Sequence, residues 1–195
     1  MAEEKPAGAA TGPTEHDRRM AAKTMAAVAI LKERFGDRIL ETKDLTTTAP
    51  VVLDPYVRVA AKDLVEVGLF CRDDPRLRFD MLSCLSGVDY PKEGKLEVVY
   101  HLDSVPMNHW LTIKVSVPRD DPKVPSLENV WRTADWHERE CFDLVGVIFE
   151  GHHNLIRILC AEDWEGHALR KDYKMPEYYH GIPNSFEMFY DVQNP

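Results

Sequence analysis

The sequence predicts an α+β fold, in which helices pack on a mixed β-sheet that contains a β-hairpin, followed by an extended C-terminal interface segment. Two stretches of alternating apolar residues, 96–102 and 111–117, flank a turn, which is typical of a hairpin with one buried face. Apolar residues recur at helical spacing within 20–35 and 135–145. After residue 150 neither period continues, so that part is expected to be loop-rich.

The chain is therefore expected to have three parts. Residues 1–13 are acidic and rich in Ala, Gly and Pro, which predicts a disordered lead-in. Residues 14–150 are expected to form the α+β domain, and residues 151–195 a loop-rich interface segment and tail. The tail is too aromatic for free disorder and too rich in proline for a core of its own. We expect another molecule to receive it; the alternative is that it folds back on its own domain.

The expected elements follow the chain in order. They are a helix capped by Thr14 and ended at Gly36, strands at 38–42 and 51–59, a helix at 63–71, a buried strand at 79–85, the hairpin with its turn at 103–108, and a helix at 135–145 ended by Gly146. The loop 118–125 carries three prolines and is expected to end the sheet.

Composition excludes several classes of function. The net charge of −9 disfavours nucleic acid, since phosphate binding needs a basic face. No apolar run approaches the roughly 18 residues of a membrane span, and the N-terminus lacks the pattern of a secretory signal. The four cysteines lack iron–sulfur spacing and are expected to be reduced thiols. No GxGxxG or Walker pattern occurs, which predicts that the chain has no nucleotide site of its own. Together with the missing cluster spacing of the cysteines, this leads us to expect no catalytic, cofactor-binding or metal-binding residue.

The helix at 135–145 holds the residues closest to a chemical motif. His137, Glu138 and Cys141 approximate the His-Glu-x-x-His helix of zinc hydrolases, with Cys141 in place of the second histidine. A further ligand would come from His152, His153 or His167. A free-standing zinc hydrolase is therefore the alternative function from a different class, and a solvated helix face with a packed cysteine is the plainer interpretation.

Helical spacing offers another explanation of the same residues. Asp135, Arg139 and Asp143 are four residues apart and are expected to form a ladder of opposite charges along one face. Glu140 is expected to lie on the apolar stripe with Trp136, where a carboxylate needs a cation or hydrogen-bond donors. A structural salt bridge is the commoner reason for such a carboxylate, and a catalytic acid is the alternative.

The segment 164–173 is dense in the side chains that anchor protein interfaces. Trp164, Arg170 and Tyr173 are of the types that dominate interface energetics. We expect this segment and the tail beyond it to hold a partner. Removal of everything after Cys160 is accordingly expected to leave the hairpin and the helix at 135–145 folded but to abolish association with that partner.

These residues resemble the 30-kDa-subunit family of type-I NADH:quinone oxidoreductase (respiratory complex I). The resemblance runs in order from about residue 63 to residue 173, and it includes Val88-Asp89, Ser126-Leu127 and Trp131 upstream. Its main motif residues, which form the expected interface, are Glu138, Arg139, Glu140, Asp143, Gly146, Gly151, His152, Arg157, Trp164, Gly166, His167, Arg170, Lys171, Asp172 and Tyr173. Two departures are visible: the family usually has proline after each Gly-His pair, and this chain has His153 and Ala168.

The resemblance implies a cofactor-free structural subunit in the peripheral arm of a proton-translocating complex. It implies docking on the large subunit of that arm, the 49-kDa homologue, with flavin and iron–sulfur clusters in other subunits carrying electrons from NADH to quinone. The place implied is the cytoplasmic side of the inner membrane, without a direct span. The equivalent subunit of a membrane-bound hydrogenase or an F420-dependent dehydrogenase complex is the alternative, because the electron donor binds elsewhere.

Overall fold

The computed structural model describes residues 15–43 and 55–184. The expected lead-in, the cap at Thr14, the first part of the strand at 51–59 and the tail from residue 185 lie outside the described residues.

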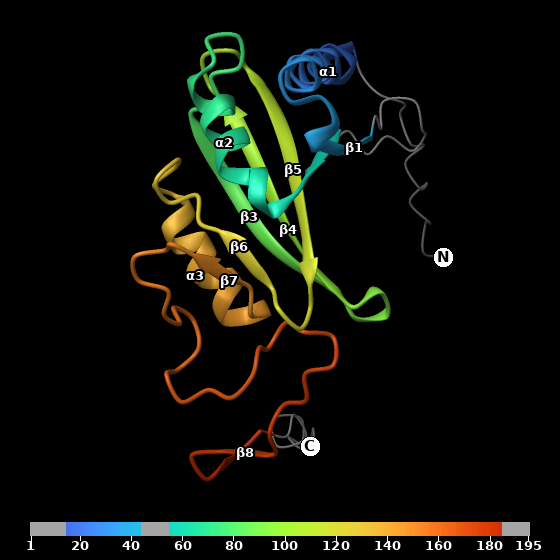
Figure 1. The fold of residues 1–195 in the computed structure, drawn as a ribbon. Helices are drawn as coiled ribbons and strands as arrows, with labels where there is room; N and C mark the ends of the chain where they lie inside the picture. Colours follow the sequence, from blue (N-terminus) through green and yellow to red (C-terminus); the bar gives the residue numbers. More distant parts are fainter. Residues whose placement is uncertain (1–14, 44–54, 185–195) are drawn as a thin grey trace, which may run out of the picture.

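A five-stranded mixed sheet forms the centre of the structure (Figure 1). Its spatial order is β1-β2-β5-β4-β3, with β2 parallel to β5 and every other neighbouring pair antiparallel. The strands are β1 (Ile39–Lys43), β2 (Tyr56–Val59), β3 (Met81–Tyr90), β4 (Lys95–Ser104) and β5 (His109–Pro118). This mixed sheet confirms the α+β class predicted from the sequence.

The predicted hairpin is confirmed by β4 and β5, and the structure adds its register. Leu102 lies opposite Leu111, and Val98 lies opposite Val115. These alternate residues are buried because they point to the face of the sheet that carries the core. Strand β3 continues to Tyr90, beyond the residue at which the sequence predicted its end.

Three helices complete the domain: α1 (Glu15–Phe35), α2 (Leu64–Asp73) and α3 (Ala134–Val145). Helices α2 and α3 lie in front of the sheet in Figure 1, while α1 lies beside the start of β5. The hydroxyl of Thr24 on α1 donates to the carbonyl oxygen of Trp110 at 2.9 Å, which ties α1 to that strand. Short 3₁₀ turns precede β1, α2 and β4, at Gly36–Arg38, Ala61–Asp63 and Pro91–Glu93.

Two small sheets were not predicted. Strand β6 (Lys123–Pro125) pairs in parallel with β7 (Ile148–Glu150), so the proline-rich loop 118–125 is not loop throughout. Strands β8 (Tyr178–Tyr179) and β9 (Ile182–Pro183) form a hairpin near the end of the described chain. Strands of two or three residues are too short to show a period, which is why the sequence did not reveal them.

Buried thiols belong to the core. Cys71 and Cys141 are buried, and burial raises the pKa of each thiol, which leaves them unreactive. The four cysteines form no disulfide with one another. Among the described residues, no helix is long and apolar enough to cross a membrane.

Helix α3 packs so closely on β3 that Gly87 has no room for a side chain. A Cβ added there would lie 2.6 Å from the sulfur of Cys141 and 3.0 Å from a methyl carbon of Val145. We expect Gly87→Ala to destabilise the domain by about 1–3 kcal/mol, because α3 must shift. Urea unfolding measures this. The loss should be smaller in a Cys141→Ala background, and an equal loss in both backgrounds would show that the sulfur is not the obstacle.

Candidate interaction site

The inner face of α3 carries a buried carboxylate, that of Glu138. This side chain is fully buried; it accepts a hydrogen bond from the Ser126 hydroxyl at 2.6 Å and one from the Leu127 backbone N–H at 2.7 Å. Burial raises the pKa of Glu138 to about 7, although both hydrogen bonds act to lower it. Glu138 therefore joins α3 to the chain that follows β6, inside the domain.

The prediction that Glu140 lies on the buried stripe was wrong. Glu140 is exposed, and Trp136, which was expected to share its stripe, is 69% exposed. The buried face of α3 consists of Ala134, Glu138, Cys141 and Val145, together with Asp143. The prediction placed the buried face of α3 on the side of Trp136, whose side chain in fact points outward. The helix is therefore rotated about its axis relative to the prediction.

The expected ladder along α3 does not form either. Arg139 donates instead to the backbone carbonyl oxygens of Ile156 at 3.2 Å and Arg157 at 3.3 Å. Asp143 pairs with Arg157 rather than with Arg139. The reason is that the loop after residue 154 runs back over α3 and offers partners closer than the next turn of the helix.

Asp143 organises that loop. One of its carboxylate oxygens accepts the backbone N–H groups of Ile158, Leu159 and Cys160, at 3.0, 2.8 and 2.8 Å. The other oxygen accepts from the Arg157 guanidinium at 2.7 Å. Burial alone would raise the pKa of Asp143, but these donors more than offset it and hold the pKa at about 2. A single ionised side chain thus fixes four consecutive residues.

The segment around His167 caps the C-terminal end of α3. The carbonyl oxygens of the last helical residues lack partners within the helix. Asp143 O contacts the His167 ring at 3.0 Å, Leu144 O accepts from Leu169 N at 2.9 Å, and Val145 O accepts from Arg170 at 2.8 Å. The guanidinium also places a positive charge at the negative end of the helix dipole.

Gly146 is required at this cap for two reasons. Its φ of +84° lies in the left-handed region, where its N–H closes the helix on the carbonyl oxygens of Cys141 and Phe142. A Cβ would also lie 2.5 Å from the ring of His167 and 2.7 Å from the guanidinium of Arg170. Its role as the helix stop, predicted from the sequence, is confirmed.

A second carboxylate, Asp89 at the end of β3, holds the next part of the segment. Its side chain accepts from Arg119 at 3.0 Å and from the backbone N–H of Lys171 at 2.9 Å. Arg119 also reaches Asp172, at 2.5 Å. In the sequence, Asp89 stands out only as part of the family resemblance, with no contact predicted for it, and nothing distinguishes Arg119.

Aromatic side chains gather beyond this anchor. The ring of Trp164 lies 6.4 Å from that of Tyr173 and 5.4 Å from that of Tyr179. The Tyr179 hydroxyl donates to Asp163 at 2.8 Å. Gly166 turns the chain at φ +78°, and a Cβ added there would lie 3.1 Å from the ring of Tyr173. The predicted interface residues of 164–173 thus contact one another and the domain.

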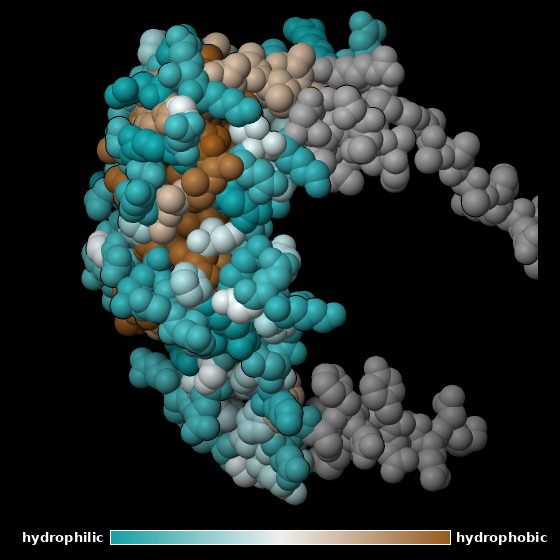
Figure 2. Space-filling view, turned by 45° about the vertical axis from the view of Figure 1, so that its right-hand side comes forward, coloured by the Kyte–Doolittle hydropathy of each residue, from teal (hydrophilic) through white to brown (hydrophobic). Residues whose placement is uncertain are grey.

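The outer face of α3 and the loop over it are rich in apolar side chains. Trp136 is 69% exposed, Leu159 63% and Ile156 51%. A hollow of about 650 Å³ separates α3 from the loop, lined by Arg132, Thr133, Trp136, His137, Glu140, Ile158 and Leu159. Figure 2, which brings the α1 side of the molecule forward, shows a separate band of hydrophobic atoms at the height of the sheet and helices, while the end near β8 is mostly hydrophilic. Exposed apolar surface of this kind marks interaction sites.

The histidines do not assemble the zinc site considered from the sequence. Glu138 is held by Ser126 and Leu127, and the sulfur of Cys141 is packed against Gly87. Across residues 15–43 and 55–184, the one place where three or more potential metal ligands gather is formed by Glu128, Asp135, His152 and His153. The alternative zinc site on His137, Glu138 and Cys141 is therefore not assembled, because Glu138 and Cys141 are engaged inside the domain.

The family model described as "Respiratory-chain NADH dehydrogenase, 30 Kd subunit" matches residues 57–179. The chain belongs to this family. Curated relatives agree: it is 48% identical over 155 residues to the C subunit of the NADH-quinone oxidoreductase of Chloroherpeton thalassium, covering 78% of this chain and 62% of the relative. It is 47% identical over 160 residues to that of Chlorobium phaeobacteroides, covering 81% of this chain and 93% of the relative.

Two solved structures share the fold of this family member. One is a chain of the membrane-bound sulfane sulfur reductase, an archaeal respiratory membrane complex, with a TM-score of 0.64 and 25% identity over 78% of this chain and 86% of that one. The other is a trypsin-resistant fragment of Nqo5, with a TM-score of 0.52 and 24% identity over 68% of this chain and 99% of that one.

Proposed function

We propose that this chain is the 30-kDa-type subunit of a proton-translocating NADH:quinone oxidoreductase, with a structural role in its peripheral arm. The observation that carries the proposal is the family match over residues 57–179, together with relatives named as this subunit. The chain holds no flavin or iron–sulfur cluster, and electrons from NADH reach quinone through cofactors of other subunits. It lies at the cytoplasmic side of the membrane without spanning it.

The hydrogen bonds of the family motif residues support a structural role. Arg157 donates to the Asp143 carboxylate and to the backbone oxygen of Gly166, and the His167 ring contacts the backbone oxygen of Asp143. Glu138 accepts from Ser126, in the chain after β6. Groups that are saturated with internal partners have little capacity left for proton transfer to a substrate. Their function in this proposal is to hold the loop 155–160 and the segment 164–173 in fixed positions on α3.

The partner in this proposal is the large subunit of the arm, the 49-kDa homologue. Its docking surface comprises the exposed Trp136, Ile156 and Leu159 with the hollow that Trp136 and Leu159 line. The aromatic cluster of Trp164, Tyr173 and Tyr179 continues this surface. The first part supplies exposed apolar area beside charged groups of both signs, which is the composition of an interface core with a polar rim. The second part supplies aromatic anchors on a segment already held by the domain, which lowers the entropy lost on binding.

Replacing the exposed apolar side chains should weaken this docking. We expect Trp136→Ala/Leu159→Ala to lower the yield of the large subunit in co-purification at least tenfold, since removal of a central aromatic anchor typically costs about 2 kcal/mol or more. Leu40→Ala is the matched control: Leu40 is 60% exposed but lies on β1. The isolated variants should unfold at the same urea concentration as the original chain. Normal assembly with lost quinone reduction would instead assign chemistry to this face.

Truncation tests the contribution of the tail. Removal of the residues after Lys174 leaves the cap on α3 and the contacts of Asp89 intact, so the domain should stay folded while its association with the large subunit weakens. Truncation after Cys160 was expected to leave the helix at 135–145 folded. Because this truncation deletes His167 and Arg170, which cap α3, we now expect it to destabilise α3 itself. Circular dichroism and co-purification measure the two effects. If the chain that ends at Lys174 binds the large subunit as tightly as the full chain, the residues after Lys174 do not contribute to the interface.

The sulfane sulfur reductase chain favours a second candidate, the equivalent subunit of a related membrane complex with a different electron donor or acceptor, such as a hydrogenase or an F420-dependent dehydrogenase. The composition of the native complex distinguishes the candidates. When this chain is used as bait in solubilised membranes, a flavin-containing NADH-oxidising subunit should co-purify with it. A complex that contains this chain but does not oxidise NADH would support the second candidate.

A further inference from the structure

The parallel pair of β6 and β7 brings two loops together at one edge. The carboxyl ends of parallel strands lie side by side, so the residues after Pro125 meet those after Glu150. Ser126 N donates to Glu150 O at 2.9 Å, which fixes this meeting. Gly151, with φ of +85°, then turns the chain so that the next two residues face the first turn of α3.

Four side chains with metal-binding atoms converge there: Glu128, Asp135, His152 and His153. One ligand atom from each lies within 4.8 Å of every other. His153 Nδ1 is 2.7 Å from Glu128 Oε2, and His152 Nε2 is 3.3 Å from Asp135 Oδ1. Ligand atoms around a tetrahedral zinc ion are about 3.3 Å apart, so these groups are near the required spacing and need to move by about 1 Å.

His152 has a different part from the others. Its side chain is fully buried, its Nδ1 accepts the Asn154 backbone N–H at 3.0 Å, and its Nε2 faces the backbone oxygen of Asp135 at 3.1 Å. The proton is therefore assigned to Nε2, which points at Asp135. A histidine that donates to a ligating carboxylate orients that ligand without binding the metal.

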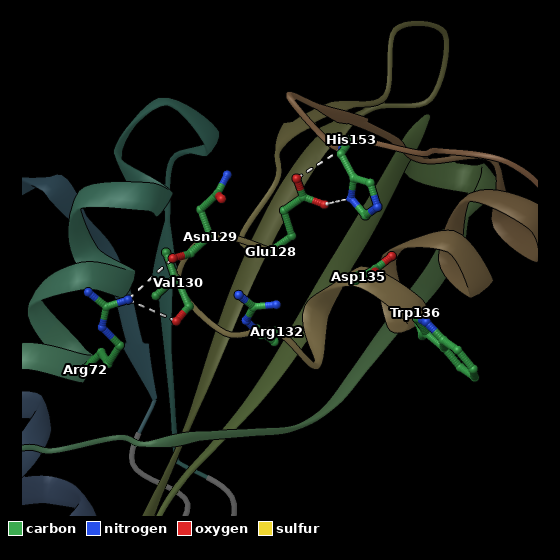
Figure 3. A pocket seen from close by; sticks show the side chains of 8 residues that line it. All are labelled: Arg72, Glu128, Asn129, Val130, Arg132, Asp135, Trp136 and His153. Atoms are coloured by element: carbon green, nitrogen blue, oxygen red, sulfur yellow. Dashed lines mark hydrogen bonds and ion pairs between the residues drawn. The ribbon is translucent and has the colours of Figure 1, made fainter.

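The remaining groups are accessible. Glu128, Asp135 and His153 line an open pocket (Figure 3), together with Arg72, Asn129, Val130, Arg132 and Trp136. His153 is exposed, and in Figure 3 its ring faces the Glu128 carboxylate. Arg72 pairs with Asp73 and donates to the carbonyl oxygen of Val130. Arg132 also lines the pocket and forms no ion pair with the described residues.

We propose that Glu128, Asp135 and His153, with Asp135 positioned by His152, bind a divalent transition-metal cation at the N-terminal end of α3. One imidazole and two carboxylates suit zinc and its neighbours in the first transition row, whereas an all-oxygen set would suit Mg²⁺. Water completes the coordination, because the pocket is open. The bound ion fastens the loop at 126–133, the start of α3 and the loop after β7 to one another.

This site is separate from the proposed electron path and does not depend on the proposed function. It replaces the expectation, drawn from the sequence, that the chain binds no metal. His153 stands where the resembling family usually has proline, so the site is a feature of this chain rather than of the motif. The imidazole that completes it comes from one of the two positions at which the chain departs from the pattern.

The test is Zn²⁺ binding to the full chain, measured by calorimetry in the presence of excess Mg²⁺. We expect one ion per chain, with affinity at least tenfold weaker in His153→Ala and in Glu128→Gln. His137→Ala, a histidine outside the cluster, should bind as the original chain does. Arg132→Ala should bind a few-fold more tightly, since a cation at the pocket opposes the ion. A merely structural role of these residues would not produce that gain.

Two results would overturn the proposal. One is the absence of Zn²⁺ binding that withstands Mg²⁺; the other is unchanged affinity in both His153→Ala and Glu128→Gln. Cobalt(II) shows whether the half-buried Cys84 and Cys160 are the ligands instead, because thiolate coordination gives near-ultraviolet absorption that nitrogen and oxygen donors lack. Circular dichroism of each variant establishes that it is folded.

Discussion

Asp143→Ala should destabilise the domain by about 3–5 kcal/mol, the usual cost of removing one partner of a buried ion pair. The carboxylate binds the Arg157 guanidinium and three backbone N–H groups, so its removal leaves a half-buried cation and three donors without a partner. Urea unfolding measures the loss. Hydrogen exchange should show that the amides of Ile158, Leu159 and Cys160 lose protection before the strands do.

Glu140→Ala is the control, because Glu140 is on the same helix but exposed. Its effect should lie within about 0.5 kcal/mol of zero. The pH dependence gives an independent check on Asp143. A pKa held below its ordinary value stabilises the fold above pH 3.8, and this contribution is lost as the pH falls towards 2. Equal urea midpoints for Asp143→Ala and Glu140→Ala would contradict the assigned role.

The main sheet could be predicted because its side chains alternate. Strands β4 and β5 each carry a complete apolar face, and a period of two over that length has one structural explanation. The parallel pairing of β2 with β5 could not be predicted in the same way, because it joins residues far apart in the sequence. The pairing of β6 with β7 could not be predicted either, and these strands are only three residues long, which is too short to show a period of two.

The family motif residues could be named from the sequence, but their contacts could not be predicted, and their part in an interface remains a prediction. The motif residues from Glu138 to Tyr173 do lie on and around α3. Their partners are mostly backbone atoms, such as the amides bound by Asp143 and the carbonyl oxygen bound by Arg170, and the sequence holds no signal for these. The predicted rotation of α3 is wrong because it places Trp136 on the buried stripe, whereas this side chain is 69% exposed.

Glu138 gives the clearest pH effect expected of this protein. Its pKa of about 7 in the folded chain lies above the ordinary 4.5, so the folded state binds the proton more tightly than the unfolded state does. The stabilisation is therefore complete below pH 4.5 and is lost as the pH rises through 7. A shift of this size corresponds to about 3 kcal/mol. Tyr100, whose hydroxyl is buried without a partner among the described residues, adds no compensating donor.

Glu138→Gln isolates this effect because it keeps the shape of the neutral acid but cannot ionise. At pH 8 the variant should be more stable than the original chain by about 2–3 kcal/mol, since the original must keep a charge in the core or take up a proton. By pH 5 the difference should vanish or reverse slightly, as the amide must rearrange its bonds to Ser126 and Leu127. Urea midpoints at several pH values measure it, with Glu140→Gln as the control that should show no such trend. A constant difference between Glu138→Gln and the original chain from pH 5 to pH 8 would show that Glu138 stays ionised, stabilised by its two donors alone.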